Sequence, residues 1–429
     1  MTAVIMAGGK GTRIASVDST VPKPMIEVAG KPVLEYQIDC LRRQGITDII
    51  LVIGHLGHVI REYFGDGSFL SRGTGMPFGV HIRYIEEKEP LGTAGALFYL
   101  KADLREDFLL LNGDIVWDVD LGRFLAFHRS RHASATLFTH PNSHPYDSGL
   151  IVSGPDGKVT AWLHKEEPRL WYRNRVNAGL HILSPRLLKS MDGLKKRDLD
   201  RDFLKPLIPS GTLYAYSSPE YVKDMGTPDR MREVENDIRT GKVQKRNLSH
   251  KQRAVFLDRD GTINKYVGFL THIEDFELLD GVAQAIRLIN HSGYLAIVVT
   301  NQPVIARGEV TEEGLREIHR KMETLLGRAG AYLDDVFVCP HHPDKGFAGE
   351  RPEYKIPCDC RKPKPGMLLR AARKYNIDLA QSFMVGDGEN DMQAGLNAGC
   401  RIAYIGESPG YPSCESLLAF AKALELRAV

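Results

Sequence analysis

One pattern constrains this chain more than any other feature: short apolar strands alternate with amphipathic helical stretches, and the pattern starts again at residue 253. The first round predicts strands at 3–9, 48–55 and 107–114 and a helix at 32–45. The second round predicts strands at 253–262, 294–302 and 381–391 and a helix at 282–293. Strands that alternate with helices form mostly parallel sheets covered on both faces. The sequence therefore predicts an α/β fold with two domains, each a mostly parallel sheet flanked by helices.

The segment between the two rounds is polar and has no strand-like apolar run. Residues 235–253 read ENDIRTGKVQKRNLSHKQR. We expect a first domain at 1–240, a linker at 241–252 with the cut near residue 248, and a second domain at 253–429. A length of 429 residues suits two domains of ordinary size.

Charge and hydropathy exclude several partners. Fifty-six basic and 54 acidic residues give a net charge of +2, so we expect no nucleic-acid partner and no acidic membrane surface. The apolar runs are strand-length, far short of the roughly 20 residues that a spanning helix needs. The first residues lack a basic segment before their apolar run, so we expect no signal peptide and a cytoplasmic location. The sequence leaves open whether copies of the chain form a homo-oligomer.

A glycine-rich turn follows the first strand, in the run MAGGKGTRIASVDSTVPKPM at 6–25. Glycines let backbone N–H groups close around phosphate oxygens, and nearby cations neutralise a triphosphate and a leaving pyrophosphate. The candidate residues are Gly8, Gly9, Gly11, Lys10, Arg13 and Lys23. The run matches neither the dinucleotide-binding motif nor the P-loop, and taken alone it would fit a tight strand-to-helix turn equally well.

The whole run GGKGTR...PKPM resembles the sugar-1-phosphate nucleotidyltransferases. The match continues in order through PLGTAGAL (90–97), LLLNGDIVWDVD (109–120), NAGLHILSP (177–185) and VKDMGTPDR (222–230). It covers essentially all of residues 1–240 and implies a Rossmann-like nucleotidyltransferase domain. In this family a sugar 1-phosphate oxygen attacks the α-phosphorus of a nucleoside triphosphate, and positioning and charge neutralisation supply most of the catalysis.

The resemblance assigns roles to individual residues. Asp114 and Asp224 match the carboxylates that hold Mg²⁺, a cation that prefers oxygen ligands. Arg13 matches the arginine facing the leaving phosphates, Lys23 the lysine near the reacting phosphate, and Gly92 and Thr93 the base and ribose region.

Two further features of this half concern its substrates. Lys165 stands where the family usually reads EKP and would bind the sugar phosphate, although His164 and Glu166 depart from the pattern and a solvated charged turn fits as well. The proline-free spacer IASVDSTV resembles the heptose 1-phosphate guanylyltransferase branch, which implies GTP or another nucleoside triphosphate and heptose 1-phosphate as substrates.

The second half opens with AVFLDRDGTIN, in which Asp258-x-Asp260 ends an apolar strand. This resembles the haloacid-dehalogenase-like phosphatases and implies a second Rossmann-like domain. Asp258 would be the nucleophile and Asp260 the general acid and base, and Mg²⁺ would screen their repulsion from a phosphate. The remaining matches follow in the family's order. Thr300 and Asn301 would contact the phosphoryl group, and Lys362, with Arg361 beside it, would neutralise the charge of that group. Asp387 would join Asp258 and Asp260 as a Mg²⁺ ligand, and Asp391 lies one helical turn further on.

Three of the six cysteines lie in one basic, proline-broken loop. Cys339-x-His341 and Cys358-x-Cys360 offer three thiolates and one imidazole, the composition of a closed structural Zn²⁺ site. Clustered cysteines in a cytoplasmic protein more often bind metal than form disulfides. Bound Zn²⁺ would order the loop and fix Arg361 and Lys362. His342 is an alternative ligand, but the C-x-H spacing and the family's CxHxP favour His341. Cys40, Cys400 and Cys414 are isolated, and we interpret them as ordinary buried thiols.

Together, DRDGTIN, the cysteine loop and CDCRKPKPGM resemble the D-glycero-D-manno-heptose 1,7-bisphosphate phosphatases and the related histidinol phosphatases. The family commonly has small residues where this chain has Pro303 and Val304, and a lysine where this chain has Gly388. The two resemblances predict a bifunctional enzyme of GDP-heptose synthesis that removes the 7-phosphate and then transfers GMP to heptose 1-phosphate. One alternative is a mannose- or glucose-1-phosphate nucleotidyltransferase fused to a histidinol phosphatase. Another is that one half is a degenerate regulatory or binding module. The residues leave the base and the anomer open.

Overall fold

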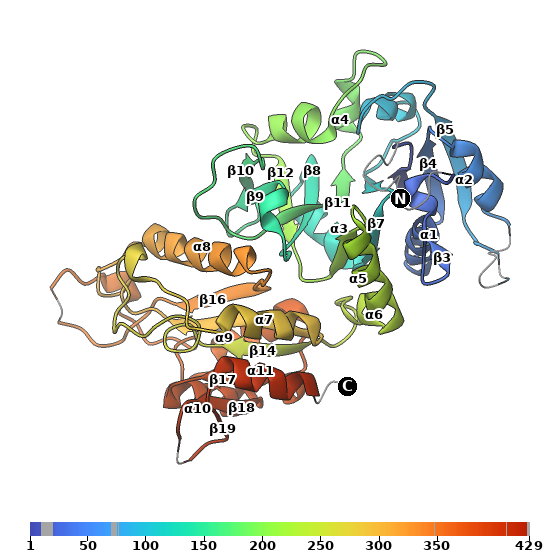
Figure 1. Cartoon of the computed structure of the whole chain (residues 1–429). Coiled ribbons are helices and arrows are strands. Elements are labelled where there is room, and N and C mark those ends of the chain that lie inside the picture. Colours follow the sequence, from blue (N-terminus) through green and yellow to red (C-terminus); the bar gives the residue numbers. More distant parts are fainter. Residues whose placement is uncertain (10–19, 70–74, 76, 347, 409, 427–429) are drawn as a thin grey trace. The chain divides into compact units, whose positions relative to one another are not determined.

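The computed structural model describes residues 1–9, 20–69, 75, 77–346, 348–408 and 410–426 (Figure 1). The chain divides into two compact units. The first consists of Met1–His140, Ile151–Trp162 and Asn177–Asn247, and the second of Pro141–Leu150, Leu163–Val176 and Leu248–Val429. Both are mixed α/β structures with mainly parallel sheets, as the alternating pattern predicts.

The sheet of the first unit has the strand order β10-β9-β11-β6-β1-β4-β5, with β8 joined to β11 and β12 beside β8. Its central strands β6, β1, β4 and β5 are parallel, whereas β11 runs antiparallel to β6. Their bounds are β1 Thr2–Met6, β4 Asp48–Ile53, β5 His81–Glu86, β6 Phe108–Asn112, β8 Ala135–His140, β9 Leu150–Ser153, β10 Val159–Leu163, β11 Val176–Leu183 and β12 Leu213–Ser217.

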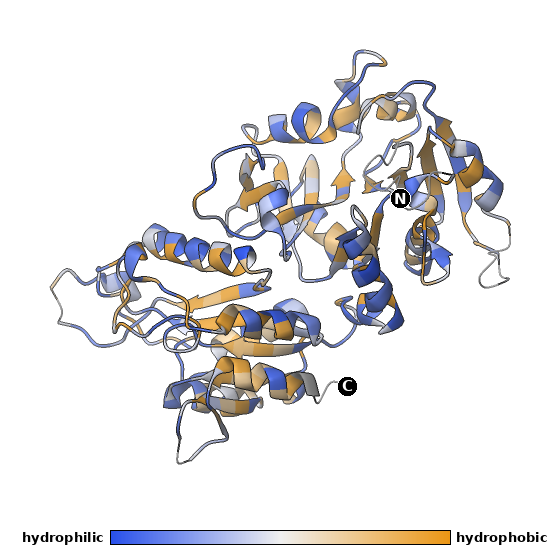
Figure 2. Ribbon diagram, viewed as in Figure 1, coloured by the Kyte–Doolittle hydropathy of each residue, from blue (hydrophilic) through white to orange (hydrophobic). Residues whose placement is uncertain are grey.

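Both faces of this sheet are buried, because successive side chains of a strand point to opposite faces. Ala3 and Ile5 of β1 pack in one core with helices α1 (Val33–Arg43) and α2 (Gly57–Phe64). Val4 packs in the other core with the 3₁₀ segment Gly95–Leu100. The further helices are α3 Leu121–Ser130, α4 Arg186–Lys189, α5 Pro228–Arg239 and α6 Lys242–Lys245. Figure 2 shows the strands as mainly hydrophobic and the outer helices as striped with polar residues.

A separate antiparallel pair, β7 (Ile115–Asp118) and β13 (Tyr221–Asp224), brings two distant parts of the first unit together. Asp224 lies opposite Ile115, and the backbone N–H of Met225 donates to the carbonyl of Asp114 at 3.1 Å. The pairing therefore makes Asp114 and Asp224 backbone neighbours, although 110 positions separate them in the chain.

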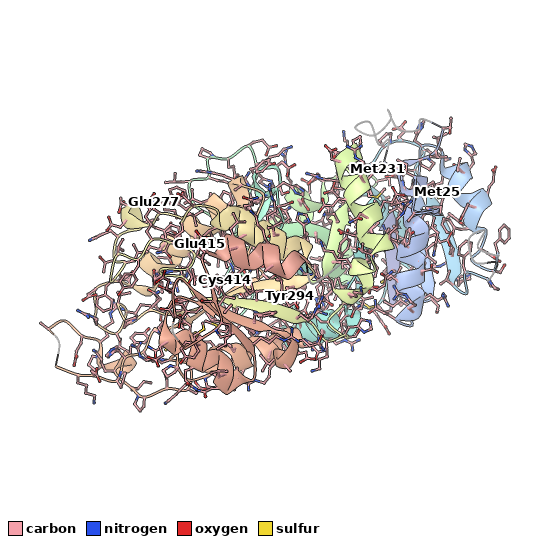
Figure 3. The ribbon with its side chains drawn as sticks, turned by 60° about the horizontal axis from the view of Figure 1, so that its bottom comes forward. Met25, Met231, Glu277, Tyr294, Cys414 and Glu415 are labelled. Carbon is pink, nitrogen blue, oxygen red and sulfur yellow. The ribbon has the colours of Figure 1, made fainter. Side chains whose placement is uncertain are left out.

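The second unit has a parallel sheet in the order β16-β15-β14-β17-β18-β19. The strands are β14 Arg253–Leu257, β15 Tyr294–Asn301, β16 Asp335–Cys339, β17 Phe383–Gly386, β18 Arg401–Ile405 and β19 Ser413–Cys414. Helices α7 (Val282–His291), α8 (Glu312–Arg328) and α11 (Leu417–Leu426) pack in one core, and α9 (Gly366–Tyr375) and α10 (Glu389–Ala398) in the other. Tyr294 belongs to the first of these cores and Cys414 packs against it; both are labelled in Figure 3.

The second unit includes two stretches that the sequence pattern had placed in the first domain, 141–150 and 163–176. Arg175 is the most deeply buried cation of these stretches, with a side chain only 4% exposed. Its guanidinium donates to the carbonyl of Asp334 at 2.7 Å and lies 3.6 Å from the carboxylate of Glu323 on α8. The backbone N–H of Asn174 donates to the same carboxylate at 2.8 Å.

Asp335, at the start of β16, is the anionic centre of this contact. Burial would raise the pKa of its carboxyl group, but the cations Lys374, Arg173 and Arg175 hold that pKa well below its usual range. Because the folded pKa lies below the unfolded one, the carboxylate stabilises the fold at neutral pH and loses that contribution in acid.

Every helix in the described part of the chain is too short or too polar to span a membrane.

We predict that Arg175→Met lowers the free energy of unfolding of the second unit by about 3 kcal/mol, because it removes the cation beside the buried Glu323 and a donor to the carbonyls of Asn174, Leu333 and Asp334. Scanning calorimetry of the full chain would resolve this transition. Arg316→Met on α8 is the matched control, since Arg316 makes only exposed ion pairs and should change stability by no more than about 0.5 kcal/mol. Equal effects of the two variants would contradict the assignment.

Candidate active sites and a candidate metal centre

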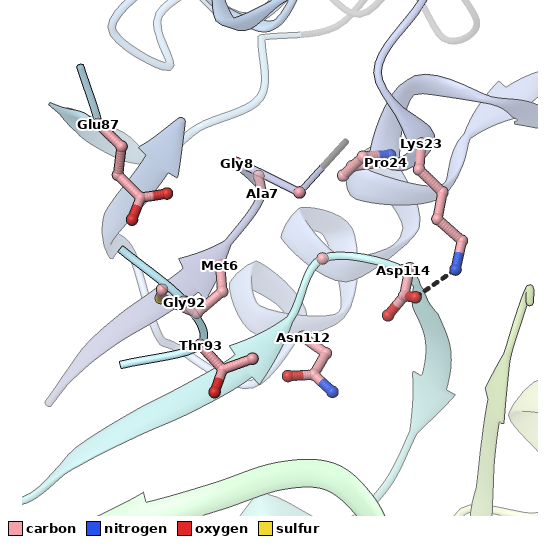
Figure 4. Close-up of a pocket in the computed structure, with 12 residues that line it drawn as sticks. Met6, Ala7, Gly8, Lys23, Pro24, Glu87, Gly92, Thr93, Asn112 and Asp114 are labelled. Carbon is pink, nitrogen blue, oxygen red and sulfur yellow. Dashed lines mark hydrogen bonds and ion pairs between the residues drawn. The ribbon is translucent and has the colours of Figure 1, made fainter. Parts of the chain in front are cut away.

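The first candidate site lies where the parallel strands β1 and β6 end side by side. A cavity of about 310 Å³ opens there (Figure 4). Its lining comes from the turn after β1, the segment after β5, the turn after β6 and the start of a 3₁₀ helix: Met6, Ala7, Gly8, Gly9, Lys23, Pro24, Glu87, Gly92, Thr93, Asn112, Gly113 and Asp114. The structure thus brings together most of the residues that the sequence assigned to a phosphate and nucleotide site.

An ion pair between Lys23 and Asp114 marks one end of this cavity (Figure 4). Lys23 opens the 3₁₀ segment Lys23–Met25, which the extended Pro22 precedes. Asp224, the second expected Mg²⁺ ligand, is not among the described residues that line the cavity, and its carboxylate accepts hydrogen bonds from Arg230 at 2.9 and 3.0 Å. A cation between Asp114 and Asp224 would have to compete with Lys23 and Arg230.

Gly92 and Thr93 form the wall contributed by the segment after β5. Gly92 has a φ of +77°, and a Cβ there would lie 2.3 Å from the carbonyl oxygen of Arg197, so only glycine fits. The Thr93 hydroxyl accepts a hydrogen bond from the backbone N–H of Leu199 at 2.7 Å. These contacts fix the wall against the segment that follows residue 196.

Four other expected residues are not placed at this cavity by the structure. Gly11 and Arg13 fall outside the described residues, as does Lys10. Lys165 is exposed in a turn within the stretch 163–176, which belongs to the second unit and not to the unit that contains the cavity.

The second candidate site lies at the carboxyl edge of the parallel sheet in the second unit. Asp258 follows β14, Thr300 lies near the end of β15, and Asp387 follows β17. Adjacent parallel strands end at one edge, which is where open α/β sheets bind ligands. A cavity of about 340 Å³ opens there, lined by Asp258, Asp260, Tyr266, Gly268, Phe269, Leu270, Thr300, Asn301, Gln302, Pro303, Val304, Arg361, Lys362, Asp387, Gly388, Asn390 and Asp391.

Lys362 is buried between two carboxylates of this site, with a side chain 2% exposed. Its ammonium lies 2.7 Å from Asp258 and 2.5 Å from Asp391. Asn301 holds the lysine backbone from both sides, since its side chain accepts from the N–H of Lys362 at 3.0 Å and donates to its carbonyl at 3.1 Å. The expected substrate-binding residue Asn301 therefore also positions Lys362.

The carboxylate of Asp260 is held by three neighbours. Arg259, which is fully buried, donates to both of its oxygens at 2.8 Å. Asn264 donates to one oxygen at 3.0 Å and Gln302 to the other at 2.8 Å. Burial would raise the pKa of Asp260, but the charge and hydrogen bonds of Arg259 hold it below its usual value. These contacts fix the Asp260 side chain in the lining of the cavity.

Asp258, Asp387 and Asp391 form a separate group that could hold a cation through side-chain oxygens, all within 4.8 Å of one another. Burial raises the pKa of Asp258 to about 6, although Lys362 opposes the shift. Burial, followed by the charge of Asp258, also raises the pKa of Asp387. Crowded, desolvated carboxylates of this kind favour a bound divalent cation, because its charge would relieve both effects.

A third cluster contains the four residues that the sequence assigned to a closed metal site. Cys339, His341, Cys358 and Cys360 each offer one atom, all within 4.8 Å of one another. The Sγ atoms of Cys339 and Cys358 are 3.6 Å apart, and Cys360 Sγ lies 3.3 Å from His341 Nδ1. A tetrahedral Zn²⁺ with bonds of about 2.3 Å would need its ligands about 3.7 Å apart, so the set fits. The alternative ligand His342 instead accepts from the N–H of Asp344 at 3.2 Å.

The departures from the family pattern are accommodated locally. Val304 is buried in a small apolar cluster with Ile305, Val310 and Leu315. Gly388 is the N-cap of α10, and its N–H donates to Asp391 at 3.1 Å. Both changes leave the carboxylates and Lys362 in contact.

Sequence reasoning missed several residues that act in these sites. Arg259, Asn264 and Gln302 hold Asp260, and each lies within four residues of a residue already singled out. Glu87 lines the first cavity only five residues before Gly92. Proximity to a motif was the available signal, but the direction of these side chains depends on the fold.

Comparison with known proteins agrees with this geometry. Residues 2–241 match the family model "Nucleotidyl transferase", and residues 195–399 match "haloacid dehalogenase-like hydrolase". The chain is 47% identical over 145 residues to a D-glycero-beta-D-manno-heptose-1,7-bisphosphate 7-phosphatase of Yersinia pestis, covering 34% of this chain and 75% of that one. It is 43% identical over 165 residues to the enzyme of that name from Escherichia coli K12, covering 38% and 84%.

One solved structure is also similar to part of this chain. The crystal structure of HddC from Yersinia pseudotuberculosis is 26% identical, covers 55% of this chain and 99% of that chain, and superposes with a TM-score of 0.46.

We predict that Lys362→Met lowers hydrolysis of a phosphate monoester at least about 100-fold, because it removes the buried cation beside Asp258, the expected nucleophile. Phosphate release at saturating Mg²⁺ is the measurement. Lys364→Met is the matched control in the same loop, since among the described residues its exposed ammonium donates to the carbonyl of Cys358 and to no carboxylate. A Lys362→Met protein that keeps wild-type turnover would contradict the role.

Proposed function

Because the chain belongs to the nucleotidyl transferase family over residues 2–241 and to the family of D-glycero-beta-D-manno-heptose-1,7-bisphosphate 7-phosphatases over its C-terminal part, we propose that it performs two consecutive steps of GDP-heptose synthesis. The first step removes the 7-phosphate from D-glycero-D-manno-heptose 1,7-bisphosphate. The second transfers GMP from GTP to the heptose 1-phosphate and releases pyrophosphate. The observation that carries the proposal is that each unit has its own cavity. The first is lined by the glycine turn with Lys23 and Asp114, and the second by Asp258, Asp387 and Lys362.

In the phosphatase step, an oxygen of Asp258 attacks the phosphorus of the 7-phosphate, and the bond from phosphorus to the sugar oxygen breaks. Asp260 gives a proton to that leaving oxygen readily, because Arg259, Asn264 and Gln302 hold its carboxyl group in place and keep its pKa below the usual value. Water then attacks the aspartyl phosphate, Asp260 takes up the proton, and inorganic phosphate leaves. Lys362 stays beside Asp258 and offsets the charge on the phosphoryl oxygens.

In the transferase step, an oxygen of the sugar 1-phosphate bonds to the α-phosphorus of GTP while the bond to the β-phosphate bridging oxygen breaks. The turn at Gly8 and Gly9 exposes backbone N–H groups for the phosphates. Lys23, which also lines the cavity, supplies positive charge. We assign Arg13 to the leaving pyrophosphate, and Gly92 and Thr93 to the nucleoside. We assign no role in this step to Lys165, because it is exposed in a turn of the second unit.

Cations complete both sites in this proposal. Asp114 and Asp224 would hold Mg²⁺ in the transferase, and Asp258 and Asp387 in the phosphatase, with Asp391 close enough to contribute. Mg²⁺ supplies charge that draws the phosphate to the carboxylates. The sequence analysis also expected Asp260 as a Mg²⁺ ligand. Because Arg259 and Gln302 engage both of its side-chain oxygens and it lies outside the group of Asp258, Asp387 and Asp391, we assign it to proton transfer alone. Zn²⁺ would be structural. We expect the reactions to take place in the cytoplasm.

The order of the steps follows from their products. The phosphatase releases a heptose that keeps its 1-phosphate, and that group is the acceptor the transferase needs. The bifunctional interpretation therefore has the phosphatase acting first.

We predict that the wild-type protein, supplied with Mg²⁺, heptose 1,7-bisphosphate and GTP, forms GDP-heptose, measured by mass spectrometry. Asp258→Asn should abolish phosphate release and leave transfer to supplied heptose 1-phosphate intact. Asp114→Asn should do the opposite, because the two carboxylates serve different cavities. Each variant is the control for the other.

Other outcomes would reject specific parts of the proposal. Faster hydrolysis of histidinol phosphate than of the heptose bisphosphate would support the alternative phosphatase. Transfer to mannose or glucose 1-phosphate in preference to heptose 1-phosphate would support the alternative transferase. Phosphate release unchanged by Asp258→Asn would show that the release comes from a contaminant.

We predict about one Zn²⁺ per chain by elemental analysis, and its loss in Cys360→Ser, because a structural site needs all four ligands. Phosphatase activity should fall as well, since Lys362 follows the last ligand by two positions. Cys400→Ser is the control, as this buried thiol lies outside the cluster. Retention of zinc by Cys360→Ser would contradict the assignment.

A further inference from the structure

His319 is a histidine of α8 that reaches the phosphatase site through one neighbour, Arg259. Its ring nitrogen Nε2 lies 3.1 Å from Nη1 of Arg259. Arg259 has a side chain that is 0% exposed, and it donates to both carboxylate oxygens of Asp260. His319 is not among the described residues that line the cavity. Any effect of His319 on the reaction therefore passes through Arg259.

The guanidinium of Arg259 divides its donors between two partners. Nε donates to Asp260 at 3.1 Å and Nη2 at 2.8 Å, which leaves Nη1 for His319. The backbone of Arg259 is held separately, since its carbonyl accepts from the N–H groups of Ile263 at 2.8 Å and Asn264 at 3.0 Å. Because a guanidinium is a rigid plane, a partner at Nη1 restrains the orientation of the other nitrogens as well. His319 thus anchors the pair of Arg259 and Asp260 to α8.

The contact requires a neutral imidazole. Arginine has no acceptor, so Nε2 of His319 must carry a lone pair and the ring proton must be on Nδ1. Burial, followed by the charge of Arg259, lowers the pKa of His319 to about 3, and the charge of Arg173 acts in the same direction. Asp260 opposes this shift. Because the folded pKa lies far below neutral pH, His319 is an uncharged acceptor when the enzyme works.

We propose that His319 is a positioning residue of the phosphatase, whose neutral imidazole holds Arg259 at Nη1 so that the guanidinium keeps Asp260 aimed at the leaving oxygen. The inference rests on the proposed phosphatase activity and adds a residue that supports its proton donor. Without His319, a buried donor of Arg259 would lack its partner, and the guanidinium would turn toward another acceptor and draw Asp260 with it. Proton transfer is sensitive to such a shift, because the donor must lie within hydrogen-bond reach of the leaving oxygen.

The need for a proton donor depends on the leaving group, and this dependence separates positioning from stability. The sugar oxygen of heptose 1,7-bisphosphate leaves as an alcohol and must gain a proton as its bond to phosphorus breaks. The oxygen of p-nitrophenyl phosphate leaves as a stabilised phenolate and needs no proton. A residue that acts through Asp260 therefore affects the first ester and spares the second. A residue that only stabilises the fold affects both in the same proportion.

The test measures the first turnover of each ester with the protein in excess and Mg²⁺ saturating, so that hydrolysis of the aspartyl phosphate does not contribute. His319→Leu should slow the first turnover of the heptose bisphosphate about tenfold, the loss of one hydrogen bond to a charged group. It should slow that of p-nitrophenyl phosphate less than about twofold. His319→Gln should return the heptose rate to within about threefold of wild type, because its amide oxygen also accepts. The ratio of the two rates does not depend on how much of a variant is folded.

His291→Leu is the matched control, because it makes the same change at an exposed histidine that ends α7. It should keep both rates. Nitrogen-15 NMR of the histidine rings tests the contact without turnover. At a pH of about 5.5, below the usual histidine pKa of about 6.5, the ring signal that disappears in His319→Gln should be that of a neutral imidazole with an unprotonated Nε2.

The outcomes separate the inference from the proposed function. If the wild-type protein hydrolyses neither ester, the phosphatase proposal fails, while the NMR signal still decides the state of His319. A protonated His319 ring at that pH would overturn the inference. An equal loss on both esters in His319→Leu would overturn it too and leave His319 a role in stability alone. So would a His319→Gln protein that is as slow on the heptose bisphosphate as His319→Leu.

Discussion

The buried contact of Lys362 with Asp258 and Asp391 is the interaction on which the second site depends. Its three members come from the end of β14, the loop after the cysteine cluster and the first turn of α10. A buried ammonium without these carboxylates, or either carboxylate without the ammonium, would be strongly destabilising. The contact therefore forms only when the sheet edge, the cysteine loop and α10 are all in place, so the cysteine cluster supports the position of Lys362.

The two halves of the chain are not separate stretches of sequence. Residues 141–150 and 163–176 fall within the range that matches the nucleotidyl transferase model, yet they belong to the second unit. Arg173 and Arg175 from these stretches offset the buried Glu323 and Asp335. A truncation at the linker would leave these carboxylates without those cations, so the fold of the second unit depends on residues far upstream.

Much of the fold could be predicted from sequence, because strand and helix periodicities are local. The helix expected at 32–45 is α1, and the strand expected at 294–302 is β15. The residues near motif glycines and aspartates could be identified as well, since chemistry restricts their types. The contact of Arg175 with Glu323 and the approach of Glu87 to Gly8 could not, because both join segments whose separation in sequence carries no periodic signal. Local patterns determine elements, whereas their long-range packing determines these contacts.

The central claim is that one chain removes a phosphate and then adds a nucleotide to the same sugar. Phosphorus NMR of a single reaction containing the wild-type protein, Mg²⁺, heptose 1,7-bisphosphate and GTP tests it most directly, because inorganic phosphate and pyrophosphate give separate signals. The account predicts that inorganic phosphate appears first and pyrophosphate follows in equal final amount. Pyrophosphate that appears without preceding phosphate, together with a GDP-heptose that still carries its 7-phosphate, would contradict it.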